Sequence, residues 1–297
     1  MSRPRRFDPP RPAVVDAVAR ALAEDLGPLG DISAALLDYP DRTVTAAVVP
    51  RSPGVLAGSA CADEAYAQLD DRVRIAWSAA DGDAVAAGVA VARVTGPLGP
   101  LLTGERTALN FLCHLSGIAT FTRRFVDAVA GHPVRIVETR KTLPGLRALE
   151  KAAVRAGGGA NHRGSLSDLV LVKDNHLGGL TIAEAVQRAR AAWPGRGVEI
   201  ECDRMEQVDE AVAAGADVVM LDNMAPDVAA ACVARVRAGT RPGTVVEISG
   251  GITLDSVAAY AAPGADVIST GAITQSAPAL DLGLDLDLDL DLDQSAG

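Results

Sequence analysis

After Pro133 the chain alternates short strand-like segments with helical ones, and this alternation constrains the fold more than any other feature. The strand-like segments, rich in Val and Ile, span residues 134–140, 168–174, 198–203, 217–223, 244–250 and 266–271. Helical patterns separate them at 146–156, 182–192, 205–214, 226–237 and 254–262. Strands that alternate with helices pair in parallel through right-handed crossovers. This part of the chain is therefore predicted to be an α/β domain built on a parallel sheet.

The ends of these strands distinguish an open sheet from a barrel. Nearly every one finishes on polar or glycine residues, among them Arg140, Asp174, Asp222 and Gly271. A barrel brings functional groups together from many consecutive strands, whereas an open doubly wound sheet gathers them at one switch point. Because only six strands are clear, we predict an incomplete parallel α/β barrel.

The first part of the chain has a different pattern. A helical segment at 14–26 stops at a glycine, and strand-like runs follow at 43–49, 72–77 and 89–94. A long helical stretch then begins, with Thr103 as its expected N-cap and Gly117 as a candidate break. We predict a smaller N-terminal mixed α/β domain over 1–115, joined by the segment 278–297, and a barrel domain over 116–277.

The C-terminal segment alternates Leu and Asp with a period of two, which is typical of an exposed edge strand. Its six aspartates could also bind calcium, but a solvated edge is the favoured interpretation. They are Asp281, Asp285, Asp287, Asp289, Asp291 and Asp293.

Composition excludes several classes of function. The net charge of -10 argues against a nucleic-acid partner. No apolar run of about 18 residues predicts a membrane span, and the basic N-terminus lacks the apolar segment of a signal peptide. The four cysteines are far apart and are expected to be reduced: Cys61, Cys113, Cys202 and Cys232. We therefore expect a cytoplasmic protein with no membrane partner.

One basic segment stands out against the acidic background. Residues 135–176 carry eight Lys and Arg against four Asp and Glu. The chain has 25 Arg but only three Lys, and all three, Lys141, Lys151 and Lys173, fall in this window. A lysine offers a compact charge that can sit close to an anion. Lys151 has the pattern of an ordinary helix-surface residue, so Lys141 and Lys173 are the candidates.

The cations of this window are placed to bind anions. Thr139, Arg140 and Lys141 end a strand, where a barrel places its ligand, and the adjacent cations suit a dianion. The glycine-rich segment 156–164 adds His162 and Arg163, and the next strand ends on Lys173. An ion pair of Arg140 or Lys141 with Glu138 is the structural alternative. A metal site at His162 and His176 lacks supporting spacing.

Acidic and glycine residues end the later strands. Glu201 and Asp222 could bind ribose hydroxyls or a magnesium ion that carries pyrophosphate. Glu199 shares a strand face with Glu201, and we assign the functional role to Glu201 because it lies nearer the strand end. The glycine segments at 248–253 and 269–274 supply backbone amides for phosphate. Their candidate residues are Ser249, Gly250, Gly251, Thr270 and Gly271.

These segments together resemble the quinolinate phosphoribosyltransferase family, in order from about residue 20 to 285. The most specific matches are ETRKTLPGLR at 138–147, GGGANHR at 157–163 and KDNH at 173–176, and GERTALN at 104–110 adds to them. The resemblance implies a mixed N-terminal domain joined to an incomplete barrel, a homodimer, and a decarboxylating phosphoribosyl transfer from phosphoribosyl pyrophosphate to quinolinate in NAD biosynthesis. It also implies Mg²⁺, supplied with phosphoribosyl pyrophosphate.

The resemblance also assigns roles to residues. It implies that Arg106 completes the neighbouring subunit's site. It implies that the quinolinate carboxylates and the phosphates are bound by Arg140, Lys141, His162, Arg163 and Lys173. Ribose and magnesium-pyrophosphate would be bound by Glu201 and Asp222, and phosphate by Ser249, Gly250, Gly251 and Gly271. Lys141, Lys173, Glu201 and Asp222 are the expected catalytic residues.

The chain departs from the family at Gln275, where a His or Lys is usual. We expect weaker binding of phosphoribosyl pyrophosphate in consequence. Two alternative functions remain: a related phosphoribosyltransferase-like protein of molybdenum-transport gene clusters, and a non-catalytic phosphate-binding barrel. The intact ERTALN and KDNH segments and the complete set of charged site residues favour the enzyme.

Overall fold

The computed structural model describes residues 7–239 and 243–287 of the chain, which form two compact units. The first unit takes in the described residues of 1–120, 148–157 and 278–297. The second takes in 121–147 and the described residues of 158–277. Each unit has its own sheet.

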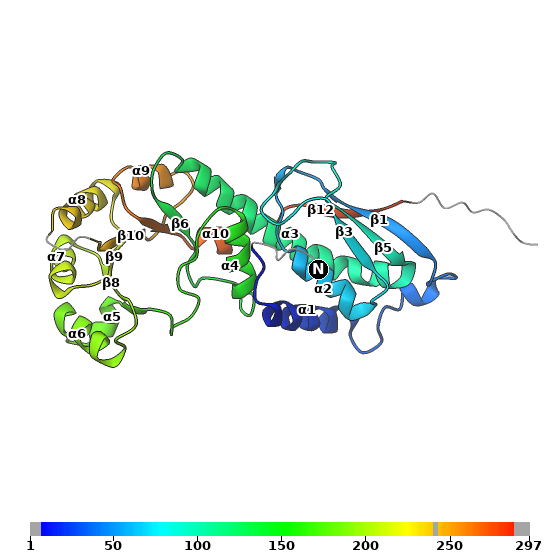
Figure 1. The fold of residues 1–297 in the computed structure, drawn as a ribbon, viewed down its shortest axis with the longest axis horizontal. Helices are drawn as coiled ribbons and strands as arrows, with labels where there is room; N and C mark the ends of the chain where they lie inside the picture. Colours follow the sequence, from blue (N-terminus) through cyan, green and yellow to red (C-terminus); the bar gives the residue numbers. More distant parts are fainter. Residues whose placement is uncertain (1–6, 240–242, 288–297) are drawn as a thin grey trace, which may run out of the picture. The chain divides into compact units, whose positions relative to one another are not determined.

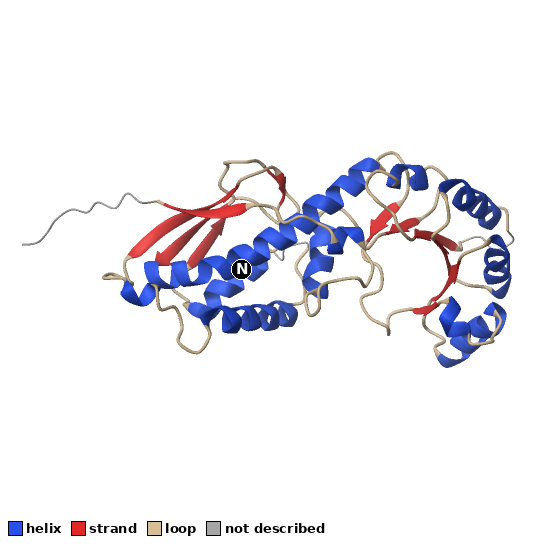
Figure 2. Ribbon diagram, turned by 180° about the vertical axis from the view of Figure 1, so that it is seen from behind, coloured by secondary structure: helices blue, strands red, loops and turns tan. Residues whose placement is uncertain are grey.

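The first unit is built on a four-stranded antiparallel sheet in the order β12-β1-β5-β3. Helices α1 and α2 and the first part of α3 cover one face of this sheet (Figure 2). Buried aliphatic residues such as Val18, Val48 and Leu112 form the core between them. The elements are α1 (Arg11–Leu26), a 3-10 turn (Ala34–Leu36), β1 (Thr43–Pro50), β2 (Gly54–Val55), α2 (Ser59–Leu69), β3 (Arg74–Trp77), β4 (Ala84–Val85), β5 (Ala92–Pro97), α3 (Leu98–Ala128), α4 (Arg147–Ala156) and β12 (Leu282–Leu286).

The second unit is built on a six-stranded parallel sheet in the order β6-β11-β10-β9-β8-β7. The strands curve into an arc, and helices α6 to α9 lie on its outer side (Figure 1). The elements are β6 (Arg135–Val137), β7 (Val170–Val172), α5 (Asp174–Leu177), α6 (Ile182–Ala192), β8 (Val198–Cys202), α7 (Met205–Ala214), β9 (Val218–Asp222), α8 (Pro226–Arg237), β10 (Val245–Ser249), α9 (Val257–Ala261), β11 (Val267–Ser269) and α10 (Ala272–Gln275).

This sheet confirms the prediction of an incomplete barrel. The first strand, β6, pairs with the last, β11, through Ile136 and Ile268, as in a closed barrel. In the described part of the chain β6 and β7 do not pair, so the arc is open between them. All six strands are parallel, and their carboxyl ends therefore lie at one edge of the sheet.

The long helix α3 differs from its prediction at two places. Thr103 lies inside the helix, where its hydroxyl donates to Asp31 across 2.9 Å, so it is not the N-cap. Gly117 does not break the helix. A Cβ there would lie 2.2 Å from the carbonyl oxygen of Pro278, so the glycine allows the returning C-terminal segment to pass close to α3. Close backbone approach, and not a helix end, explains this glycine.

Lys151 was also predicted wrongly. We expected a helix-surface lysine, but its side chain is buried in α4 at 7% exposure. The preceding residue of α4, Glu150, is also fully buried, and its carboxylate lies 2.9 Å from His114 Nε2 in the first unit.

The predicted C-terminal edge strand is confirmed over Leu282–Leu286, where β12 pairs with β1 at the edge of the first sheet. Asp285 and Asp287 form ion pairs with Arg51 and Arg93. The remaining Leu-Asp alternation, with Asp289, Asp291 and Asp293, lies outside the described residues. No helix within the described ranges is both long and apolar enough to span a membrane.

Candidate functional site

A cavity of about 720 Å³ lies at the carboxyl ends of the barrel strands. Every strand of the parallel sheet, or the residues just after it, contributes to the lining, and the segment between α4 and β7 adds His162 and Arg163. It consists of Thr139, Arg140, Lys141, His162, Arg163, Leu171, Lys173, Glu201, Met220, Asp222, Asn223, Glu247, Ser249, Gly250, Gly251, Ile252, Thr253, Ser269, Thr270, Gly271, Ala272, Gln275 and Ser276. This is where a barrel places its active site.

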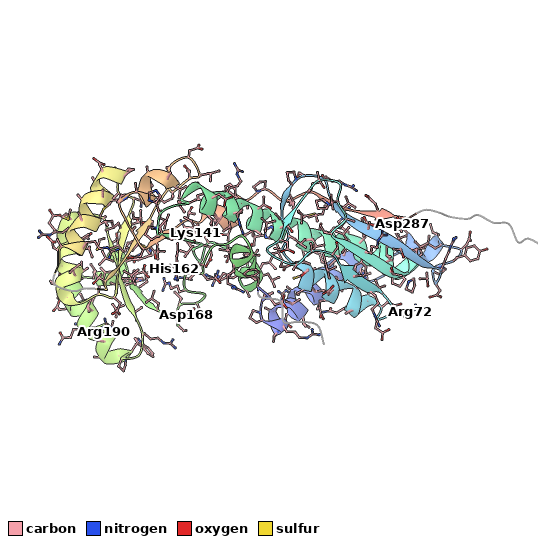
Figure 3. The ribbon with its side chains drawn as sticks, turned by 45° about the horizontal axis from the view of Figure 1, so that its top comes forward. Arg72, Lys141, His162, Asp168, Arg190 and Asp287 are labelled. Atoms are coloured by element: carbon pink, nitrogen blue, oxygen red, sulfur yellow. The ribbon has the colours of Figure 1, made fainter. Side chains whose placement is uncertain are left out.

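The cavity brings together all but one of the residues singled out from the sequence. Arg106 is the exception: it lies on α3 in the first unit and does not line the cavity. The structure places the others side by side but leaves their roles as predictions. Five of them are basic or can become so, and Lys141 and His162 are labelled in Figure 3. A cavity with this lining is suited to ligands with several negative charges.

Lys173 and Glu201 form an ion pair inside the cavity. Lys173 follows β7 and Glu201 lies on the neighbouring strand β8, so the parallel pairing brings the two side chains together. Glu201 is largely buried and Lys173 is half-exposed. A lysine held by a carboxylate in this way has a fixed position from which it can donate its remaining hydrogens to a bound anion.

Lys141 is held by the short helix α10, which follows β11. Its carbonyl oxygen accepts a hydrogen bond of 2.7 Å from the Thr274 hydroxyl. Its side chain passes over Gly271, where an added Cβ would lie 2.9 Å from Lys141 Cδ. Gly271 therefore leaves room for the lysine to reach into the cavity, which the sequence did not reveal.

Asp222 is positioned by Asn223, a residue the sequence analysis did not single out. The Asn223 amide donates to the Asp222 carboxylate across 2.6 Å, and its backbone N–H donates to Ser249 across 3.0 Å. Asn223 has a φ of 55°, the only positive φ of a non-glycine among the described residues. Such strain costs about 1 to 3 kcal/mol and concentrates at functional sites. Asp222 and Asn223 both line the cavity.

The irregular segment that carries His162 and Arg163 is attached to Glu138 at the end of β6. The Glu138 carboxylate accepts hydrogen bonds of 2.8 Å from the Asn161 side chain and 3.1 Å from the His162 backbone N–H. Glu138 is fully buried. These two hydrogen bonds tie the carboxylate to the segment that carries His162 and Arg163.

Two further buried carboxylates lie beside the His162 ring. Nε2 is 3.1 Å from Glu247 Oε2 and 3.4 Å from Glu199 Oε2. Burial lowers the pKa of His162, but hydrogen bonds and charges from these carboxylates outweigh it and raise the pKa to about 9. Nδ1 accepts a hydrogen bond of 2.8 Å from the Arg163 backbone N–H, which opposes a second ring proton. Because Nδ1 is an acceptor here, the ring proton is on Nε2, where it faces the two carboxylates.

Arg140 and Arg163 supply a strong positive field. Burial and the nearby charge of Arg140 lower the pKa of Arg163 from its ordinary value, although a guanidinium stays charged at neutral pH. Arg140 Nε is buried and has no hydrogen-bond partner in the described part of the protein. A buried donor without a partner is costly unless a ligand satisfies it. The arginines therefore favour binding of a carboxylate or phosphate.

Comparison with known proteins identifies the family of the chain. The family models "Quinolinate phosphoribosyl transferase, C-terminal domain" and "Quinolinate phosphoribosyl transferase, N-terminal domain" match residues 118–285 and 31–116. The chain is 43% identical to the nicotinate-nucleotide pyrophosphorylase [carboxylating] of Mycobacterium leprae over 91% of its length and 96% of that protein. It is also 43% identical to the human protein of that name, over 80% of each.

The fold comparison gives the same result. The solved structure of the nicotinate-nucleotide pyrophosphorylase from Francisella tularensis superposes with a TM-score of 0.89. The two chains are 38% identical, and the match covers 96% of this chain and 100% of that one.

Proposed function

The chain belongs to the quinolinate phosphoribosyltransferase family, and we propose that its cavity joins quinolinate to phosphoribosyl pyrophosphate with loss of carbon dioxide. It is thus an enzyme of NAD biosynthesis, a carboxylating pentosyltransferase. The alternatives of a molybdenum-transport relative and a non-catalytic barrel are not favoured, because the curated relatives carry the name of the carboxylating enzyme.

The cationic side of the cavity is suited to quinolinate. Its two carboxylates match the paired guanidinium groups of Arg140 and Arg163, and Lys173 adds a third donor. The unpartnered Nε of Arg140 is the single observation that most supports this proposal, because a dicarboxylate would satisfy it. Lys141 lies on the β11 side, where it can contact the phosphates of the second substrate.

The acidic and glycine-rich side is suited to phosphoribosyl pyrophosphate. Glu201 and Asp222 can accept hydrogen bonds from ribose hydroxyls, and Gly250, Gly251 and Gly271 expose backbone amides for phosphate. The carboxylates of Glu201 and Asp222 are also the oxygen ligands that magnesium prefers, so they fit a magnesium ion held with the pyrophosphate. Magnesium bound there would neutralise charge on the leaving pyrophosphate.

The charge arrangement suggests how the reaction proceeds. Pyrophosphate leaves C1 of the ribose with the bonding electron pair, and the pyridine nitrogen of quinolinate attacks the cationic C1. Lys141 stabilises the negative charge that develops on the leaving group. The alkylated nitrogen then draws electrons from the ring, so the adjacent C2 carboxylate leaves as carbon dioxide. Its bonding electrons remain on C2, which takes up a proton.

The direct test is incubation of the purified protein with quinolinate, phosphoribosyl pyrophosphate and Mg²⁺. We expect nicotinate mononucleotide, pyrophosphate and carbon dioxide in equal amounts. A folded protein that forms no nicotinate mononucleotide would refute the proposal. Omission of Mg²⁺ tests the metal separately, since activity should then be lost and return when the ion is added.

We further propose that the enzyme is a homodimer in which Arg106 completes the partner's cavity. Subunit complementation tests this. Arg106→Ala and Lys173→Ala should each keep at most about a tenth of the wild-type activity, but a mixture refolded together should recover about a quarter of it, because half the dimers are mixed and one of their two sites is intact. If the mixture stays as inactive as its components, each site is built from one chain and the assignment of Arg106 is wrong.

Gln275 lines the cavity beside Gly271, so its replacement of a usual His or Lys bears on substrate binding. A cation at this position would add one charge-assisted contact to phosphate. We expect Gln275→His to lower the KM for phosphoribosyl pyrophosphate about threefold to tenfold at slightly acidic pH. The KM for quinolinate serves as the control and should change little; an unchanged KM for phosphoribosyl pyrophosphate would contradict the prediction.

The proposal also includes a cytoplasmic location and small-molecule substrates, without nucleic acid or membrane. The net charge of -10 supports the absence of a nucleic-acid partner. Cell fractionation with an antibody against the chain tests the location.

A further inference from the structure

We propose that the buried glutamates Glu199 and Glu247 are positioning residues for quinolinate binding, which they serve by anchoring the segment that carries Arg163. The proposal rests on the proposed function, because it concerns the same cavity. It assigns a role to two residues that the sequence analysis left as structural or did not mention. Neither is expected to form a direct contact with the substrate.

The first observation is the placement of three acids in the barrel interior. Glu138 directly follows β6, Glu199 lies on β8 and Glu247 lies on β10, so alternate strands of the sheet supply them. Alternate strands build the interior layers of a barrel, which are ordinarily filled by Val, Ile and Leu. All three glutamates are at most 3% exposed. Three buried glutamates at positions that aliphatic residues ordinarily fill indicate a role other than packing.

The second observation is that these acids are poorly satisfied by the protein. Among the residues described, neither carboxylate oxygen of Glu199, nor Glu247 Oε1, makes a hydrogen bond of good geometry, and Glu199 Oε2 has only its 3.4 Å contact with His162 Nε2. Burial and the charge of Glu247 raise the pKa of Glu199 above its ordinary value. A buried ionisable group of this kind lowers the stability of a fold unless it is well compensated. Glu199 and Glu247 are therefore expected to lower the free energy of unfolding, which is typical of residues that serve the site and not the stability of the fold.

The third observation is what the three acids hold. Glu138 binds the Asn161 side chain and the His162 backbone, and Glu199 and Glu247 lie around His162 Nε2. The ring in turn accepts from the backbone N–H of Arg163. Residues 161–169 include no helix or strand, so side-chain contacts have to fix their path. The acids thus set the position of Arg163 through His162.

A metal site is the competing interpretation, since ligand atoms of His162, Glu199 and Glu247 all lie within 4.8 Å of one another. A histidine can bind a metal only through a nitrogen that carries no proton. Here the Arg163 amide donates to Nδ1, which leaves the proton on Nε2, the nitrogen that faces the carboxylates. The guanidinium of Arg163 acts electrostatically on both carboxylates and adds positive charge beside them. The arrangement favours anchoring.

The test uses the neutral isosteres Glu199→Gln and Glu247→Gln, each as the full chain. We expect the KM for quinolinate to rise at least about tenfold, and the KM for phosphoribosyl pyrophosphate to change less than about threefold. Amide hydrogen exchange of residues 158–164 should accelerate about tenfold or more. The Tm should stay within about 2 °C of wild type or rise, because a buried charge has been removed. If the two glutamates only stabilised the fold, the Gln variants would instead have a lower Tm, and the KM values for both substrates would change by similar factors.

The matched control is Glu150→Gln, which changes another fully buried glutamate beside a histidine, His114, in the first unit. It should leave the KM for quinolinate and the exchange of residues 158–164 as in wild type. His162→Gln, which removes the ring and keeps the carboxylates, should reproduce the faster exchange.

Three results would overturn the proposal. The first is that both Gln variants keep the wild-type KM for quinolinate and the wild-type amide exchange of residues 158–164. The second is that the KM values for both substrates rise by the same factor. The third is that neither variant folds. Failure of the proposed function is distinguishable, because it shows as absence of product in the wild-type protein. The exchange measurement needs no substrate and still decides whether the acids anchor the segment.

Discussion

Lys173→Ala is expected to reduce kcat/KM for quinolinate by about 10-fold to 150-fold, the range that corresponds to one charge-assisted contact of about 1.5 to 3 kcal/mol. The loss should be in this range because the change removes a cation from the cavity and also leaves the largely buried Glu201 carboxylate without its ion-pair partner. Steady-state kinetics with each substrate varied in turn provide the measurement.

Further variants separate the loss of the cation from the loss of the ion-pair partner of Glu201, and provide a control. Glu201→Gln alone and Lys173→Ala combined with Glu201→Gln complete a double-mutant cycle, whose coupling energy separates loss of the ion pair from loss of the contacts that each side chain makes with the substrates. Arg188→Ala removes an exposed cation from α6, outside the cavity, and should leave kcat/KM unchanged. If Lys141→Ala and Lys173→Ala both lost less than tenfold, the assignment of these lysines to substrate orientation would fail.

Gly250→Ala is expected to unfold or strongly destabilise the barrel unit. A Cβ at this position would lie 2.3 Å from Asn223 Oδ1 and 2.6 Å from the Asn223 backbone nitrogen, and the φ of Gly250 is +92°. Asn223 is itself strained and holds Asp222, so it cannot move away without loss of the site. We expect a loss of about 3 kcal/mol or more in the free energy of unfolding, measured by urea denaturation.

The next residue provides the control. Gly251 also has a positive φ, +60°, but an added Cβ would meet nothing within 4 Å. Gly251→Ala should therefore cost only the backbone strain, about 1 kcal/mol. Equal losses for the two variants would show that the contact with Asn223 is not what requires Gly250.

The barrel elements could be predicted because their patterns are strong. Helices α6, α7 and α8 have the same bounds as their predictions, since each has a regular apolar stripe. The strands are shorter than predicted. Residues 138–140 were assigned to the first strand, but the chain leaves the sheet after Val137, and Thr139 and Arg140 line the cavity. Polar residues at the end of a predicted strand therefore predict the position of the site more reliably than the length of the strand.

The acidic interior could not be predicted from spacing. Glu199 shares the inward strand face with Glu201, and only the tertiary structure shows that it lies beside His162, far away in sequence. Glu247 carried no sequence signal at all, because a single acid within an apolar strand is also compatible with the outer face. A signal for Asn223 was equally absent, since nothing in the sequence indicates its positive φ.

The pairing of β6 with β11 has a consequence for how the protein folds. These strands are separated by about 130 residues, and contacts between distant segments form slowly because the intervening chain has to be ordered first. Lys141 follows β6 and is held by Thr274, which follows β11. On the ribosome, this lysine cannot reach its final position until residue 274 has emerged. A nascent chain that stops short of that point lacks the contact that fixes Lys141, so completion of the site is coupled to completion of the barrel.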